Sequence, residues 1–558
     1  MNRLIGALLV ASLTMASTGC FKGEEDTCEF WTEKLAKSSA VDRALKKVGE
    51  LRCSSAIPVL QQLYEEGQFQ ESILQKIKEI GDKQASVPIL KMALRSETYA
   101  KLAASIIADW RLTETKGELV KILTDDKLAE SRDAALTAIL AFEDPKALED
   151  TLIALAGYDP NIQGFEVNAK AIDVLGEIAS VKAVPTIVKM AYSRTNKAAE
   201  VYRNARIALT RIGTGVREKV EGVLAGDDQD IKNYTRGIGV QDWESRYGPK
   251  TVQMLGDTMD PKAVPALAKS LSDELVPPAG VSDKALEAWI NGQKTRLKVI
   301  MLALSRLGTD QAVETLGKVV KDPAADTRGQ RLNAAFALAA IGSEPALTAL
   351  VEAWKNEPTE EFKRPLLQQL SLAVDNATLT AIDKDLNVHV DALKEALGKS
   401  EVKVEEIKGK IAAGPDESQL ETLRQEEAYY TAERDGFKLT IDQVGVYLNA
   451  TRECQDNESC WLKKIQSKDQ NEQVKALNIL ARGKIGDRQR VVDAMFAAFN
   501  SAEKAQLDTK NFALIGIARL GNAVAAARLL KIVSELSESD VYWRDELTAL
   551  GNALSRRK

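Results

Sequence analysis

Five cysteines and one histidine are the side chains of this 558-residue chain best suited to chemistry. His389 lies between two valines, and no Ser or Cys motif of a nucleophilic site accompanies it. One imidazole excludes every site that needs two or more, such as His-rich zinc and non-haem iron sites. A surface or packing role is therefore favoured for His389 over a catalytic one.

Recognisable motifs for phosphate binding, acyl transfer and metal binding are absent from the sequence. Neither G-x-x-x-x-G-K-[ST] nor G-x-G-x-x-G occurs, and the elbow G-x-S-x-G is missing. Asp227, Asp228 and Asp230 form the best acidic cluster for a hard cation, but the loop glycine and distant glutamate of an EF-hand are lacking. A solvated turn is favoured there. We predict no catalytic residue, no metal site and no cofactor.

The first twenty residues have the layout of a secretory signal. Arg3 precedes an apolar stretch over residues 4–13, and small residues then lead to Cys20. The stretch is too short for a permanent membrane anchor. The ending at residues 16–20 resembles the lipobox of bacterial lipoproteins, although Ser17 stands where that family usually has Leu.

This resemblance implies that residues 1–19 are removed and that Cys20 carries lipid, including palmitate-like acyl chains. Residues 20–28 then form a polar tether. Family sorting rules, applied to Phe21, imply a cell-envelope protein anchored in the outer membrane, on its periplasmic side or at the cell surface. The alternative is ordinary signal cleavage nearby, with Cys20 as an incidental thiol.

Four further cysteines allow three disulfide connectivities. The local pairing of Cys28 with Cys53 and of Cys454 with Cys460 is favoured in a linear array of repeats, because residues hundreds of positions apart would lie far apart. An exported chain is compatible with oxidation. Four buried thiols are the alternative.

A sequence pattern recurs along the chain. It predicts an apolar helix that ends near Gly, a short turn, and a second helix that often has Pro in its first turn. It appears at residues 171–188 and again, with many alanines, at residues 332–342. These segments resemble HEAT repeats, including the phycobilisome-lyase type. The resemblance implies an all-α solenoid of about ten stacked hairpins.

The repeats are expected over residues 29–384 and 437–558, with residues 29–60 and 544–554 as caps. Residues 273–280 contain two prolines and are expected to form an extended loop.

Residues 385–436 interrupt the repeats and read as a charged helical hairpin around Gly414 and Pro415. Its first helix, of about 27 residues, would be about 40 Å long. The hairpin either projects to meet a partner or packs flat with a solvated charged side. The expected apolar seam comprises Val388, Leu393, Leu397, Val404, Ile407, Ile411, Leu420, Leu423, Ala428 and Tyr429.

The charge pattern bears on partners. The whole chain has a net charge of -6 and lacks the basic footprint of nucleic-acid binding. Residues 385–436 alone hold 13 acidic and 7 basic side chains. We predict a membrane-anchored, non-catalytic scaffold that binds envelope proteins through this hairpin or the concave face of the solenoid. The alternatives are an enzyme or enzyme subunit acting on an envelope substrate, and a carrier of an apolar ligand in the groove.

Overall fold

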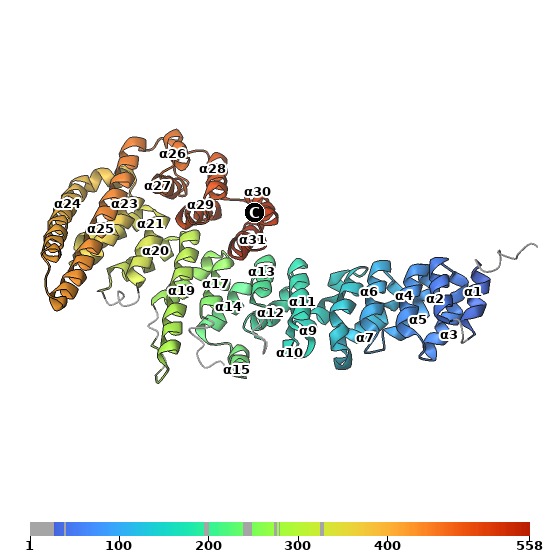
Figure 1. Ribbon diagram of the computed structural model, residues 1–558. Helices are drawn as coiled ribbons and strands as arrows, with labels where there is room; N and C mark the ends of the chain where they lie inside the picture. Colours follow the sequence, from blue (N-terminus) through green and yellow to red (C-terminus); the bar gives the residue numbers. More distant parts are fainter. Residues whose placement is uncertain are drawn as a thin grey trace, which may run out of the picture. The chain divides into compact units, whose positions relative to one another are not determined.

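The computed structural model is all-α, and every regular element of the described residues is a helix (Figure 1). The described residues are 27–37, 41–194, 200–237, 248–272, 276–277, 279–323 and 329–557. The signal peptide, Cys20, most of the tether and half of the predicted loop at 273–280 lie outside them.

The chain divides into two compact units. Unit 1 comprises residues 1–151 and 158–167, and unit 2 comprises residues 152–157 and 168–558. Unit 1 contains α1 (Cys28–Leu35), α2 (Val41–Glu50), α3 (Ile57–Glu65), α4 (Gln70–Ile80), α5 (Lys83–Ala93), α6 (Ala100–Trp110), α7 (Lys116–Thr124), α8 (Arg132–Leu140) and α10 (Pro160–Gln163). Residues of α9 (Glu149–Gly157) and α11 (Phe165–Glu177) are divided between the units.

The repeated phrase of the sequence produces helical hairpins, as its residues require. Gly81 ends α4 in the left-handed conformation, with φ of 78°, and Asp82 caps α5 by accepting from the Ala85 amide at 3.1 Å. Pro58 lies in the first turn of α3. Short 3-10 turns precede several helices: η1 (Ser54–Ala56), η2 (Thr113–Thr115), η3 (Asp126–Ser131), η4 (Pro145–Leu148), η5 (Val181–Ala183) and η6 (Pro261–Ala263).

Unit 2 begins with two parallel rows of helices. The row that we call the inner row consists of α13 (Tyr202–Ile212), α17 (Gly248–Asp257), α19 (Asp283–Leu307), α21 (Gln330–Ile341) and α23 (Glu360–Ala373). The other row consists of α12 (Val184–Met190), α14 (Val216–Ala225), α18 (Val264–Ser272), α20 (Asp310–Lys321) and α22 (Glu344–Asn356). The short helix α15 (Gln229–Gly237) follows α14.

The two longest helices are α24 (Asn376–Ala412) and α25 (Glu417–Cys454), which pack against each other as an antiparallel hairpin. The hairpin is longer than the predicted range 385–436. Its first helix already begins at Asn376, because Asp375 caps α24 by accepting a hydrogen bond from the Thr378 amide at 2.9 Å. Gly414, with φ of 74°, makes the predicted turn.

The seam of the hairpin differs in part from the predicted one. Leu393, Val404 and Ile407 are buried in it. Val388 and Tyr429 are instead 65% and 63% exposed, and Ala428 is exposed as well. Including them in the seam was wrong.

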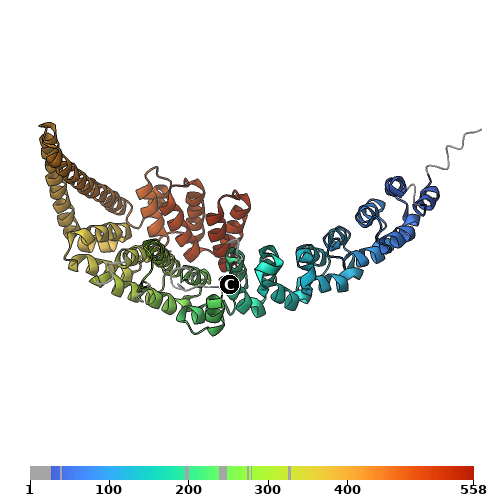
Figure 2. The same cartoon turned by 60° about the horizontal axis from the view of Figure 1, so that its bottom comes forward.

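The chain then returns along the inner row, so the array is not linear. The C-terminal arm consists of α26 (Glu458–Ile465), α27 (Gln470–Leu480), α28 (Arg488–Ser501), α29 (Leu507–Leu520), α30 (Ala523–Glu535) and α31 (Val541–Ser555). Helix α27 packs on α23, α29 on α19, and α31 on α13 and α17 (Figure 2). Asn552 donates to Thr210 at 3.0 Å, across 342 positions of sequence.

This return corrects two expectations. Residues hundreds of positions apart do meet, because the long hairpin reverses the direction of the chain. Residues 544–554 belong to α31, which is packed between helices rather than capping an open end.

The two disulfides nevertheless join cysteines that are close in sequence. Cys28 pairs with Cys53 and Cys454 with Cys460, each with Cα atoms 5.3 Å apart. The first ties α1 to the start of η1, and the second ties the end of α25 to α26. This is the local pairing favoured on the sequence.

Candidate functional site

The sole histidine lies at the base of the long hairpin, where it joins the repeats. His389 is buried and stacks on Trp354, with ring centroids 5.7 Å apart. The Trp354 indole donates to His389 Nδ1 at 2.9 Å, and Nε2 lies 2.6 Å from a Glu360 carboxylate oxygen. Because the indole N–H can only donate, His389 Nδ1 accepts this hydrogen bond. Nε2 therefore carries the ring proton and donates a hydrogen bond to Glu360. His389 therefore packs α24 onto α22 and α23.

The acidic cluster of the sequence is a helix start. Asp228 accepts from the Ile231 amide at 3.1 Å and pairs with Lys219. Burial acts to raise the pKa of Asp228, but the hydrogen bonds with Lys219 and the Ile231 amide, together with the charge of Lys219, outweigh it, and the net shift is downward. Within the described ranges, no group of three or more His, Cys, Asp or Glu side chains is arranged to hold a metal ion.

A buried ionic cluster joins α31 to the inner row. Arg206 binds Asp257 through Nε at 2.5 Å and Glu546 through Nη2 at 2.6 Å. Arg306 binds the other Glu546 oxygen at 2.8 Å. These four side chains, at most 10% exposed, come from α13, α17, α19 and α31. We call them the buried ionic cluster.

The pKa values of the two carboxylates in this cluster are shifted in opposite directions. Burial acts to raise the pKa of Glu546, but Arg206 and Arg306 together lower it to about 2. Burial raises the pKa of Asp257, and this outweighs the attraction of Arg206. Glu546 is thus the carboxylate held most firmly as an anion.

The contact between the inner row and the C-terminal arm, which we call the arm seam, also contains buried cations. These cations belong to the C-terminal arm and bind the ends of inner-row helices. Lys475, which is fully buried, donates to the carbonyls of Ser371, Leu372 and Val374 at 3.0, 3.1 and 2.6 Å. These carbonyls have no intrahelical partner at the end of α23, where the helix dipole also favours a cation. Burial lowers the pKa of Lys475 well below its usual value.

Arg519 also donates to carbonyls at helix ends, and it does so for two inner-row helices. It donates to the Ser305 carbonyl at 2.9 Å and to the Ala340 carbonyl at 2.8 Å, at the ends of α19 and α21. Burial, aided by the nearby Arg482, lowers the pKa of Arg519 to about 9. A Cβ on Gly308, whose φ is 60°, would lie 3.1 Å from Arg519 Nε, so glycine leaves room for the guanidinium.

The contact between the inner row and the C-terminal arm was not predicted from the sequence. The segments 306–308 and 519–521 both read Arg-Leu-Gly, and the glycines were recognised as helix ends. The arginine before each glycine was the available signal. It could not have identified the partners, because Arg306 binds a carboxylate whereas Arg519 binds carbonyls.

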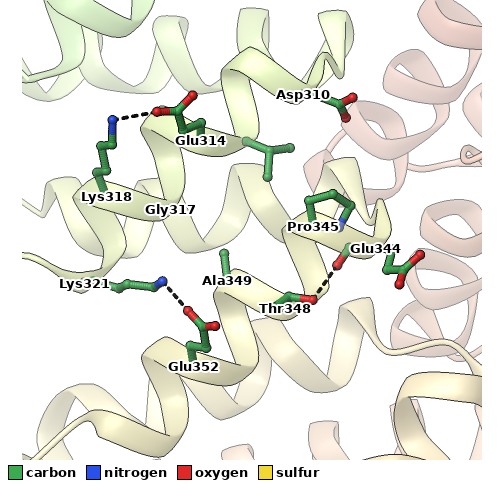
Figure 3. A pocket seen from close by; sticks show the side chains of 11 residues that line it. Asp310, Glu314, Gly317, Lys318, Lys321, Glu344, Pro345, Thr348, Ala349 and Glu352 are labelled. Carbon is green, nitrogen blue, oxygen red and sulfur yellow. Dashed lines mark hydrogen bonds and ion pairs between the residues drawn. The ribbon is translucent and has the colours of Figure 1, made fainter.

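A groove of about 590 Å³ lies between α20 and α22 (Figure 3). Glu314 pairs with Lys318 at 2.7 Å along its rim, and Lys321 pairs with Glu352 across it. Asp310 and Glu344 occupy the first turns of α20 and α22, where the helix dipole stabilises acids. Helix electrostatics and ion pairing account for these side chains.

One comparison with known proteins agrees with the helical-hairpin fold, over a single hairpin. Residues 330–353, in α21 and α22, match the family model described as the PBS lyase HEAT-like repeat. An engineered protein whose crystal structure comes from the Northeast Structural Genomics Consortium aligns over 94% of this chain and 98% of its own, at 15% identity and a TM-score of 0.19. That likeness is too slight to support a shared shape. No curated protein matches the chain. The described residues define an all-α protein built from consecutive helical hairpins, and one of these hairpins matches a HEAT-like repeat.

Proposed function

We propose that this protein is a lipid-anchored, non-catalytic scaffold of the bacterial cell envelope, which binds another envelope protein through the distal hairpin, residues 391–435. The observation that carries the proposal is the exposure of this segment. The turn end of α24 and α25 stands away from the other helices of unit 2 (Figure 2). Its buried side chains are Leu393, Ser400, Val404 and Ile407, all at the contact between the two helices.

The charge of the distal hairpin is concentrated on one helix. Residues 391–412 of α24 hold five acidic and five basic side chains, several of them paired along the helix, such as Lys399 with Glu395 at 2.7 Å. Residues 416–435, which are the N-cap residue Asp416 and the first part of α25, hold seven acidic and two basic side chains. This net charge of -5 favours a basic partner and would speed its approach.

The inner row is a less suitable surface than the distal hairpin. Its helices from α13 to α23 are contacted by α27, α29 and α31 of the same chain. A partner for that face would have to compete with the C-terminal arm. This favours the hairpin over the concave face of the solenoid.

Binding is favoured over catalysis because the groups that could react are already engaged. Asp257 and Glu546 are held by arginines, and His389 is held by Trp354 and Glu360. An enzyme acting through two carboxylates needs one of them free to exchange a proton or attack.

Membrane attachment in this proposal depends on Cys20. Among the helices that the structure describes, none is both long and apolar enough to cross a bilayer. Acyl chains on Cys20 would supply the anchor, at about 0.8 kcal/mol for each buried methylene. Cys20→Ser should move the protein from the membrane to the soluble fraction, whereas Ser17→Leu, which completes the lipobox pattern, should leave it in the membrane. An unchanged distribution of Cys20→Ser would refute the anchor.

The binding role is tested by shortening the hairpin. Ser400 donates to Glu433 at 2.9 Å, which marks positions that face each other on the two helices. Replacing residues 400–433 with a tight turn should therefore keep the base of the hairpin intact. Affinity capture from cells should lose the main envelope partner with this variant and keep it with the full hairpin. Capture of the same partner by both would contradict the proposal.

A further inference from the structure

A cleft of about 510 Å³ lies where α17 and α19 of the inner row face α29 and α31 of the C-terminal arm. This volume falls within the range of about 300 to 1,000 Å³ typical of small-ligand sites. Its apolar wall includes Val299 and Leu302 from α19, Leu507 from α29 and Trp543 from α31. Leu507 and Tyr542 line it while remaining 48% and 52% exposed, so an apolar rim is open to solvent.

The charged groups in the floor of the cleft balance one another. Asp257, Arg306 and Glu546 line it, and all three belong to the buried ionic cluster. A ligand therefore meets no unbalanced charge at the floor. Two polar atoms of lining residues, Arg306 Nε and Asn511 Oδ1, have no hydrogen-bond partner within the described residues, but both are buried and neither is exposed to the cleft. A polar group of the ligand at the floor would therefore lose water without reaching either atom, so we expect the part of the ligand that enters most deeply to be apolar.

Hydrogen-bond donors remain available on the sides of the cleft. Lys298 is exposed on α19 and forms no ion pair within the described ranges. Tyr542 also lines the cleft, and its hydroxyl is a second possible donor. One unpaired cation and one hydroxyl in the same lining match a ligand with a single negative charge.

From this arrangement we infer that the cleft binds a carboxylate carried on an apolar body. The carboxylate lies against Lys298 and Tyr542, and the apolar body lies along Val299, Leu302 and Trp543. A fatty acid and the apolar C-terminal residue of a peptide share this chemistry. The inference is independent of the proposed role of the distal hairpin, because the cleft and the hairpin share no residue.

Two pairs of probes distinguish the sources. Dodecanoate is compared with dodecanol, and a short peptide ending in Leu-Leu with a free carboxylate is compared with its C-terminal amide. Binding to the full-length Cys20→Ser protein is followed by calorimetry and by tryptophan fluorescence. At least one carboxylate should bind more tightly than its neutral counterpart, and which one binds identifies the source.

Variants locate the site. Lys298→Met should weaken carboxylate binding by about tenfold or more, since hydrogen bonds to charged groups contribute about 1.5–3 kcal/mol. Tyr542→Phe should weaken it less. Lys294→Met, one turn away on α19 and outside the cleft lining, is the matched control and should leave binding unchanged. The inference is overturned if neither carboxylate binds at about 1 mM, if the neutral probes bind equally well, or if Lys298→Met and Lys294→Met behave alike.

Discussion

The inner row and the C-terminal arm meet through two kinds of buried charge. At α31, Arg206 and Arg306 are balanced by carboxylates, above all by Glu546. At α27 and α29, Lys475 and Arg519 are balanced by the carbonyls that end α23, α19 and α21. The first region pairs full charges, and the second pairs full charges with helix dipoles.

The difference appears in the pKa values. Glu546 keeps its charge so firmly that its pKa falls to about 2, whereas Lys475 has its pKa lowered by burial. Carbonyl dipoles therefore offset less of the cost of burial than a carboxylate does. Folded Lys475 binds its proton less readily than the unfolded chain does, so its contribution to stability improves as pH rises.

The largest effect is expected for Glu546→Gln. It leaves Arg306 buried without an anion, and breaking a buried pair costs about 3–5 kcal/mol. The free energy of unfolding in urea measures this loss. Asp545→Asn is the adjacent control, because Asp545 pairs with Arg203, which is 51% exposed, and the loss there should stay below about 1 kcal/mol. Equal losses in the two variants would remove the distinction between buried and exposed pairs.

Acid should reveal the same carboxylate. The folded pKa of Glu546 lies below its ordinary value of 4.5, so its contribution is present above that pH and is lost as pH falls toward about 2. The shift corresponds to up to about 3 kcal/mol. The difference in unfolding free energy between wild type and Glu546→Gln should shrink between about pH 5 and pH 2. Comparing the two proteins cancels the titration of carboxylates outside the buried ionic cluster, and a constant difference would contradict the assignment.

At the carbonyl end of the seam, Arg519→Met should cost about 1–3 kcal/mol. The variant leaves the Ser305 and Ala340 carbonyls buried without donors, although it also removes a buried cation. Arg528→Met removes a partly exposed arginine paired with Asp493 and should cost less than about 1 kcal/mol. Thermal unfolding of both variants measures the contrast. An Arg519→Met protein as stable as wild type would mean that the carbonyls do not need the arginine.

Local features of the fold were predictable from the sequence, and the seam was not. The glycine ends of helices and the turn at Gly414 follow from short-range rules of helix termination. The pairing of Arg206 with Glu546 joins residues 340 positions apart, and no periodicity encodes it. A surface or packing role was predicted for His389, but its burial and its partners Trp354 and Glu360 depend on how α24 crosses the preceding repeat.

The smallest effect on stability is expected for the shortened hairpin described above. The deleted segment buries few side chains, and it contacts mainly itself. The free energy of unfolding should change by less than about 1 kcal/mol, while helical circular dichroism falls in proportion to the residues removed. A large loss of stability would mean that the distal hairpin supports the repeats and does not simply extend from them.

The most direct test of the scaffold role is site-specific photo-cross-linking in intact cells. A photoreactive residue replaces Tyr429, which is 63% exposed on the distal hairpin, and in a second protein replaces Val524, which is 67% exposed on α30. The proposed function predicts a discrete adduct with an envelope protein from position 429 and none from position 524. No adduct from position 429, or the same adducts from both positions, would contradict it.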